Sequence, residues 1–190
     1  PLPRGNRVAI ITNAGGPGIM TTDAAVRHGL TLATLSDETR ARLKENLPPT
    51  ASLGNPVDVI GDATHERYEA AIRSVMMDDG VDGAIVILTP QAMTRPTEVA
   101  AAVIVAAASS KKPILTSWMG GRQVEASREL FNNAHIPDFR TLENAVDAFS
   151  YLARYNRNQR LLLQTPSRLT GGQEPPDTVG ARLIMEGVLT

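Results

Sequence analysis

The sequence has 190 residues, of which 42% are hydrophobic, and this is enough to bury the core of one ordinary domain with an appendage, or of two small domains. A formal net charge of −1 and only 4% aromatic residues argue against a nucleic-acid surface. The absence of cysteine excludes disulfides, zinc thiolate sites and thiol catalysis, and it fits a reducing compartment. Because we find neither a membrane-length apolar run nor a signal peptide, we expect a cytoplasmic protein without membrane contact.

The first informative segment combines an apolar run with a glycine-rich turn. Residues 8–11 are apolar, Thr12 and Asn13 end the run, and glycines follow at positions 15, 16 and 18. We expect a buried strand, a glycine loop and then a helix over 19–26, with Pro17 tolerated in the first turn, where no N–H is needed. Backbone N–H groups and the helix dipole favour an oxyanion at such a place. The expected phosphate-binding residues are Asn13, Ala14, Gly15, Gly16, Pro17 and Gly18.

The glycine spacing by itself leaves two interpretations open. It matches neither a Walker loop, which would end in Gly-Lys-Ser/Thr, nor the Gly-x-Gly-x-x-Gly dinucleotide fingerprint. A tight strand-to-helix turn that binds nothing explains it about as well as a phosphate site. If the site exists, valine at Gly16 should disturb it through crowding and through any need for a positive φ.

Strand and helix patterns alternate further along the chain. Residues 30–35 predict a second strand, and Ser36 is placed to cap a polar helix that ends near Asn46. Residues 55–60 predict a short extended segment, with Pro56 at its start or on a sheet edge. Thr64 is placed to cap another helix, whose apolar stripe consists of Tyr68, Ile72, Val75 and Met76.

The second half of the chain repeats the alternation. We expect strands over 83–89 and 113–118 and a short edge strand over 136–139. Residues 98–109 are almost wholly Ala, Val and Ile, so this helix should lie deep against a sheet or meet a partner. A polar helix should end near Asn133. The stripe of the last helix of the domain consists of Leu142, Ala145, Val146, Phe149 and Leu152.

Strands separated by helices predict an α/β fold: a doubly wound parallel sheet of the flavodoxin-like or Rossmann-like type, in three α/β/α layers, ending near Asn156. Ligands of such folds bind outside the carboxyl ends of the strands, where loops 13–18, 89–96 and 118–122 should meet. Residues 164–176 have a linker composition, and a further stripe of Val179, Leu183, Ile184 and Val188 needs a neighbour. We therefore expect a domain over 1–160 and a linker with a helix over 161–190, in a piece of a longer protein.

Several segments agree, in order, with one family. Four segments carry the resemblance: residues 6–18 with Asp23, Leu47-Pro48-Pro49, residues 55–59 and Thr89-Pro90-Gln91. They resemble the nucleoside-diphosphate-forming (ADP-forming) acyl-CoA synthetases. This family includes the ADP-forming acetate-CoA ligases and belongs to the succinyl-CoA ligase superfamily. The resemblance covers roughly residues 5–155. It implies a flavodoxin-like, succinyl-CoA ligase-like module. Such a module works beside a CoA-binding module that carries a phosphohistidine and beside an ATP-grasp module.

The resemblance also implies an activity for the complete protein. The family converts an acyl-CoA, phosphate and ADP into the acid, CoA and ATP through an acyl phosphate and a phosphohistidine. The helix after Gly15–Gly18 is similar to one of the two helix N-termini that hold the histidine's phosphoryl group, and the tail leads toward the ATP-grasp part. We therefore expect no cofactor on this chain alone, but CoA, ADP or ATP, and Mg in the complete enzyme.

The resemblance leaves this chain without a nucleophile. The family's histidine lies in a Ser-His-Thr-Gly type motif, and His28, His65 and His135 lack such surroundings, so each is expected to be a surface or structural residue. We expect no catalytic residue and no metal ligand in this chain, and no synthetase activity from it alone.

Other residues near the expected site have two interpretations each. Asp58 would orient the histidine ring or hold the loop, or it would only cap its own turn through an Asx hydrogen bond. Trp118 with Met119 would line a pocket or pack in the core, and for Asp23 a structural role is favoured. The expected supporting residues are Asn55, Asp58, Gly61, Gly120 and Gly121.

Two rival functions stay open beside the synthetase module. One is a regulatory or scaffold role in a protein acetyltransferase that contains a synthetase-like array. The other is a generic flavin-binding module, which the scarcity of aromatic residues disfavours.

Overall fold

The computed structural model describes residues 1–164 and 177–188. The strands are β1 (Arg7–Thr12), β2 (Thr31–Leu32), β3 (Val57–Asp58), β4 (Gly83–Leu88) and β5 (Ile114–Trp118). The helices are α1 (Gly15–Arg27), α2 (Asp37–Asn46), α3 (His65–Met76), α4 (Pro96–Ala108), the 3-10 turn η1 (Arg122–Val124), α5 (Glu125–Asn133), α6 (Leu142–Leu162) and α7 (Thr178–Val188).

The strands form one parallel sheet in the order β2-β1-β4-β5, as the alternation of strands and helices predicts. β2 and β3 share one edge of β1: β2 pairs with the first two residues of β1 and β3 with the last two. The Asn55 side chain fills the gap between them. It donates to the carbonyls of Val8 and Ala33, at 2.9 Å each, and accepts from the Ile10 N–H at 2.9 Å.

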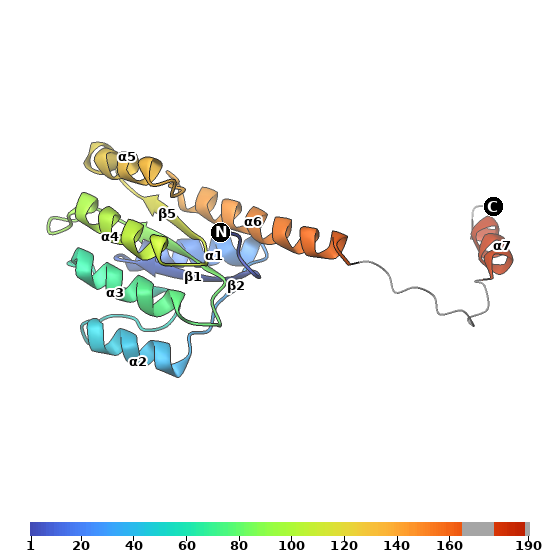
Figure 1. Cartoon of the computed structure of the whole chain (residues 1–190), viewed down its shortest axis with the longest axis horizontal. Helices are drawn as coiled ribbons and strands as arrows, with labels where there is room; N and C mark the ends of the chain where they lie inside the picture. Colours follow the sequence, from blue (N-terminus) through green and yellow to red (C-terminus); the bar gives the residue numbers. More distant parts are fainter. Residues whose placement is uncertain (165–176, 189–190) are drawn as a thin grey trace.

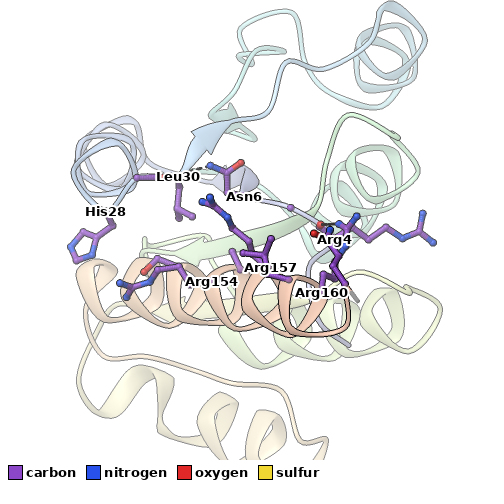
Figure 2. Close-up of a pocket in the computed structure, with 13 residues that line it drawn as sticks. Arg4, Asn6, His28, Leu30, Arg154, Arg157 and Arg160 are labelled. Atoms are coloured by element: carbon purple, nitrogen blue, oxygen red, sulfur yellow. Dashed lines mark hydrogen bonds between the residues drawn. The ribbon is translucent and has the colours of Figure 1, made fainter. Parts of the chain in front are cut away.

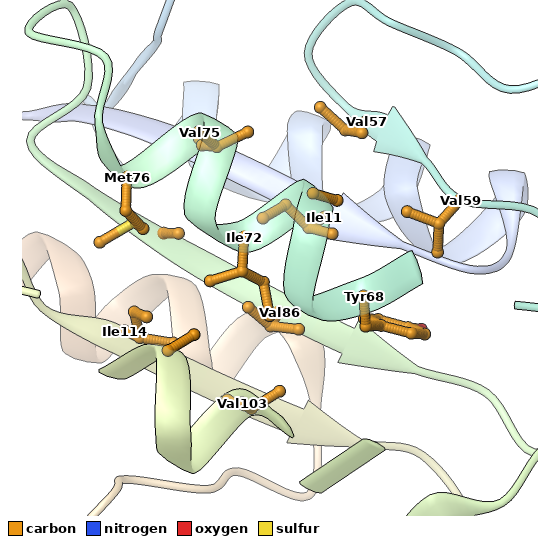
Figure 3. Packing of buried hydrophobic residues seen from close by; sticks show 14 of the residues in the cluster. Ile11, Val57, Val59, Tyr68, Ile72, Val75, Met76, Val86, Val103 and Ile114 are labelled. Carbon is orange, nitrogen blue, oxygen red and sulfur yellow. The ribbon is translucent and has the colours of Figure 1, made fainter. Parts of the chain in front are cut away.

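Helices cover both faces of the sheet, which gives the expected three layers (Figure 1). One hydrophobic cluster lies between the sheet and the α1 and α6 side, and it includes Ile10, Ile85 and Phe149. The other lies on the side of α2, α3, α4 and α5, and Figure 3 shows part of it around Ile72 and Val86. The Ala/Val/Ile-rich α4 buries its Val99 and Val103 there, so this helix lies against the sheet.

Some elements differ from expectation for local reasons. The strand predicted over 30–35 keeps only two residues, because the Asn55 side chain takes the place of a neighbouring strand beside Ala33. The edge strand predicted over 136–139 is reduced to a single parallel bridge between Thr116 and Asp138. The helix predicted from residue 19 begins at Gly15, so the glycines form its first turn rather than a separate loop. α6 continues past Asn156 to Leu162.

The end of the chain is described only in part. Val179, Leu183 and Ile184 on α7 are 64–70% exposed, so within the described residues the stripe stays uncovered. The Val188 side chain and positions 165–176 of the expected linker lie outside the described residues. In the part of the chain that the structure describes, no helix is both long and apolar enough to cross a membrane.

Candidate functional site

Three loops meet at the carboxyl end of the sheet, as expected for this fold class. The Asn13 carboxamide exchanges two 2.9 Å hydrogen bonds with the backbone of Thr89. The Met119 N–H donates to the Leu88 carbonyl at 2.8 Å. Gly120 has a φ of +141°, and a Cβ there would lie 3.1 Å from Pro90 Cγ, so this position needs glycine. Loop 13–18 is therefore bonded to loop 89–96, and loop 118–122 is bonded to the end of β4 beside it.

Tyr68 is hydrogen-bonded to the backbone at the start of loop 13–18 and at the end of β4. Its side chain is fully buried, and its hydroxyl donates to the Ile87 carbonyl at 2.8 Å. The Asn13 backbone N–H bonds the same phenol oxygen, and burial raises the pKa of Tyr68 well above its usual value, so the group stays neutral. The sequence analysis took Tyr68 only as part of an apolar stripe. The signal for this second role was a hydroxyl on an otherwise aliphatic face.

The backbone N–H groups of the α1 start are not equally available. The Ala14 N–H already bonds the Thr12 hydroxyl at 3.1 Å, and the Gly18 N–H bonds the Ala14 carbonyl at 3.2 Å. Pro17 has no N–H. Among the six expected phosphate-binding residues, only Gly15 and Gly16 therefore present N–H groups that have no partner in the described part of the chain, and both residues are exposed. The expected phosphate site is therefore reduced to this pair of N–H groups, which we call the α1 nest.

Gly16 does not play the steric role expected for it. Nothing lies within 4 Å of a Cβ built there, and Gly16 is not among the residues with positive φ. Neither a positive φ nor crowding against the described protein atoms therefore requires glycine here, and crowding of a bound phosphate by valine stays a prediction. The tight glycine is Gly18, where a Cβ would lie 3.1 Å from Thr12 Cγ2 and 3.4 Å from Pro56 Cβ. A side chain at Gly16 would point into open space.

Asp58 stands beside the nest. Its Oδ1 accepts the Ile60 N–H at 2.9 Å, so the Asx turn that the sequence indicated is present. Its Oδ2 lies 3.7 Å from the position of a Cβ on Gly15, which places a negative charge next to the start of α1. Ile60 has a φ of +72°, an uncommon conformation for a β-branched residue, so this turn carries local backbone strain.

The other expected supporting residues separate into two groups. Gly61 lies against Gln91, since a Cβ there would collide with the Gln91 side-chain oxygen, and Gly120 and Gly121 follow β5 at the same end of the sheet. Asn55 belongs instead to the middle of the β1 edge, where it holds the backbone.

The remaining candidate residues lie in the core or at the surface. Trp118 is fully buried and packs edge-on against Phe131 with ring centroids 4.7 Å apart, so it is a core residue. His28 ends α1 and pairs with Asp147 at 2.8 Å, whereas His65 lies beside Glu66 and Glu98. Asp23 and His135 are exposed. The residues that the structure describes contain no group of three or more potential metal ligands.

Comparison with known proteins gives one consistent result. A family model for the Ligase-CoA domain matches residues 8–163. The chain is 42% identical over 155 residues to an acetate–CoA ligase (ADP-forming) of Methanocaldococcus jannaschii, which covers 80% of this chain and 22% of that protein. It is 39% identical over 162 residues to the alpha subunit of acetate–CoA ligase (ADP-forming) II of Pyrococcus furiosus, covering 83% of this chain and 35% of the subunit.

A solved structure agrees with these relatives. It is a dinucleotide-forming acetyl-coenzyme A synthetase 1 from Ca. Korarchaeum cryptofilum, in complex with phosphate and ADP. The TM-score is 0.78 at 29% sequence identity, and the match covers 87% of this chain and 37% of that one. The chain thus spans about a third or less of the length of these relatives.

Proposed function

This chain belongs to the Ligase-CoA domain family, and we propose on that premise that it is the ligase module of an ADP-forming acyl-CoA synthetase. The complete protein would convert an acyl-CoA, phosphate and ADP into the acid, CoA and ATP. Its other modules would carry the phosphohistidine, CoA, and the nucleotide with its Mg. Residues 161–190 would lead from this module toward the ATP-grasp module, and we place the protein in the cytoplasm.

The observation that carries the proposal is the α1 nest. Two exposed N–H groups, those of Gly15 and Gly16, lack a partner within the described chain at the start of a 13-residue helix. The helix dipole adds the equivalent of about half a positive charge there. We assign this nest to the phosphoryl group of the phosphohistidine, which it would neutralise without a side-chain cation.

Asp58 has a defined part in this arrangement. Its Oδ2 lies beside the nest, so the Asp58 carboxylate would repel a phosphoryl group bound there if no other group lay between the two negative charges. A neutral histidine that presents one ring nitrogen to the phosphoryl group has its N–H on the other nitrogen, and the phosphorylated ring keeps that N–H as an imidazolium, so a carboxylate is a suitable acceptor for it. We therefore assign Asp58 to the orientation of the incoming imidazole.

The test compares two helical glycines in the complete synthetase. A Cβ at Gly16 and a Cβ at Gly187 both meet nothing within 4 Å, so G16V and G187V introduce the same side chain without a clash. G16V should screen the nest and lower phosphohistidine formation from ATP by about a hundredfold, within the range seen when oxyanion donors are lost. Binding of acyl-CoA should stay within about twofold, since this interaction does not use the nest.

The control and the isolated chain complete the test. G187V should phosphorylate at the wild-type rate. Wild-type phosphorylation in G16V, or equal loss of phosphorylation and acyl-CoA binding, would show that the glycines serve only the turn. The isolated 190-residue chain should show no turnover of acetyl-CoA, ADP and phosphate, and turnover above background would contradict the assignment of the nucleophile to another module.

A further inference from the structure

A basic cleft lies at the opposite end of the sheet from the α1 nest. Its volume is about 420 Å³, and it opens between the chain before β1, the turn before β2 and the last turns of α6. Figure 2 shows Arg154, Arg157 and Arg160 along α6, with Arg4, Asn6, Leu30 and His28 facing them. No aspartate or glutamate is among the residues that line the cleft. We call it the amino-end cleft.

The α6 arginines gather because of helical spacing. Positions 154, 157 and 160 follow one another at intervals of three, which places their side chains along one side of the helix. They are scattered in the sequence, so a search for a run of basic residues does not find them.

The two walls of the cleft are joined by hydrogen bonds. Asn156 donates to the Pro3 carbonyl at 2.8 Å, and Arg160 donates to the Arg4 carbonyl at 3.4 Å. On the other side, the Asn6 side chain donates to the Gly29 carbonyl at 3.0 Å. The cationic side chains thus project from backbone segments whose relative positions are fixed.

The positive charges of the cleft are only partly compensated. Within the described residues, the four arginines form no ion pair with a carboxylate, and His28 alone is paired, with Asp147 at 2.8 Å. Arg154 lies over the Tyr151 ring at 4.6 Å, and the C-terminal dipole of α6 offsets part of the charge of Arg160. Guanidinium groups on both sides of one cavity repel each other unless an anion lies between them.

We propose that the amino-end cleft binds a small anion that carries at least two phosphate groups. Guanidinium groups match phosphate oxygens in bidentate geometry, and a diphosphate spans more than one of them. Leu30, Ala153 and Leu161 give the cleft an apolar lining as well, which suits an organic part attached to the phosphates. The arginines line one bounded cavity rather than an extended groove, and this favours a compact ligand over an acidic protein segment.

The site is separate from the proposed phosphoryl nest. The six residues of β1 span about 20 Å, and Asn6 and Asn13 lie just outside its two ends. A ligand in the amino-end cleft therefore cannot be the group that the nest holds. The two sites can be tested in one experiment, because their backbone amides report on them independently.

The experiment titrates the 190-residue chain with pyrophosphate and with ADP, and follows amide chemical shifts. We expect pyrophosphate to shift the amides of Asn6 and Gly29 first. The double variant R154Q/R157Q should weaken this binding by about tenfold or more, because two charge-assisted contacts are lost. As a control, R40Q/R73Q removes the same charge from two exposed arginines on α2 and α3, and it should change the affinity by less than about twofold.

The outcomes discriminate between sources and between classes of ligand. Tighter binding of ADP than of pyrophosphate would identify a nucleotide-like ligand, and equal binding would identify the phosphates alone, and both support the cleft. The proposal is overturned by absence of cleft shifts at millimolar pyrophosphate, by equal weakening in the two double variants, or by tighter binding of hexaglutamate than of pyrophosphate. Shifts confined to Gly15 and Gly16 would support the α1 nest while refuting the cleft.

Discussion

The two ends of the sheet present positive charge in different ways. At the carboxyl end, the α1 nest consists of two backbone N–H groups, and a carboxylate, Asp58, lies next to them. At the amino end, the cleft has four arginines and no carboxylate among its lining residues. The nest results from how the backbone is held, whereas the cleft results from which side chains α6 carries.

This difference suits the two regions to two kinds of anionic ligand. A pair of N–H groups with partial charges suits one phosphoryl group that arrives and leaves during a reaction. Several full charges suit a ligand with a higher charge, and their attraction weakens as salt screens it. Substitutions of side chains should therefore affect the cleft directly, but the nest mainly through the residues that fix its loop.

The largest expected effect is a loss of stability that disturbs both ends of the sheet at once. Asn55→Ala removes three hydrogen bonds to β1 and the segment after β2, and leaves the Ala33 carbonyl and the Ile10 N–H without partners among the described residues, whereas the Val8 carbonyl keeps its bond from the Ala33 N–H. The free energy of unfolding should fall by about 3 kcal/mol or more, and amides at both ends of the sheet should shift, because β1 connects them. Urea denaturation measures the loss.

A matched substitution controls for the loss of an asparagine. Asn46→Ala removes one exposed hydrogen bond to the Arg42 carbonyl and should cost less than about 0.5 kcal/mol. Equal losses in the two variants would show that Asn55 does not bridge the strands.

A smaller effect should be confined to the carboxyl end. Tyr68→Phe removes the hydroxyl that bonds Ile87 and Asn13, so the loop before the α1 nest loses its support. We expect a destabilisation of about 2 kcal/mol and altered amide shifts at Asn13 to Gly16. The amides of Asn6 and Gly29 should stay unchanged. Shifts of equal size at both ends would show that Tyr68 supports the whole sheet rather than this loop.

Low pH should weaken an ion pair at the amino end of the sheet, between Asp82 and Arg7. Burial opposes the ionisation of Asp82, but the hydrogen bonds and charge of Arg7 outweigh it, so the pKa of Asp82 is lowered from 3.8. The ionised carboxylate therefore stabilises the fold above pH 3.8, and this contribution is lost as the pH falls further.

The corresponding variant is Asp82→Asn. It should cost about 1 kcal/mol at neutral pH, because the pair is half exposed on the Arg7 side. The difference from wild type should shrink as the pH falls below 3.8, which thermal unfolding across pH measures. A difference that is independent of pH would exclude the ion pair as its cause.

The smallest effect concerns the cleft itself. Arg157 is exposed and has no carboxylate partner in the described residues, so Arg157→Gln should change the free energy of unfolding by less than about 0.5 kcal/mol. The change should be slightly favourable at low salt, because one repelling charge is gone. A clear destabilisation in urea denaturation would mean that Arg157 serves the fold rather than a ligand.

Much of the fold could be predicted because each strand and helix has a local signal. The apolar runs of β1 and β4 and the stripe of α3 need no knowledge of the partner elements. β2 could not be delimited in this way, since its end depends on Asn55, which lies more than 20 residues further along the chain. The start of α1 was misplaced because three glycines read as a loop, although the first turn of a helix tolerates them.

The candidate site was predictable to the level of a segment but not of an atom. The sequence located the loop at 13–18, but only the hydrogen bonds of Thr12 and Tyr68 show which N–H groups remain free. The arginines of the amino-end cleft were not found, because their proximity to Arg4 joins two segments about 150 residues apart.

The hydrogen bond between Asn156 and Pro3 has an evolutionary consequence. It places the path by which the polypeptide enters the domain beside the path by which it leaves, at the end of the sheet away from the nest. A unit of this kind can be moved by gene fusion or fission as a cassette, since splicing it into another reading frame leaves the carboxyl end of its sheet undisturbed. With its two ends side by side, the domain is more readily exchanged between proteins as a whole than replaced by a new domain in which the α1 nest has to evolve again.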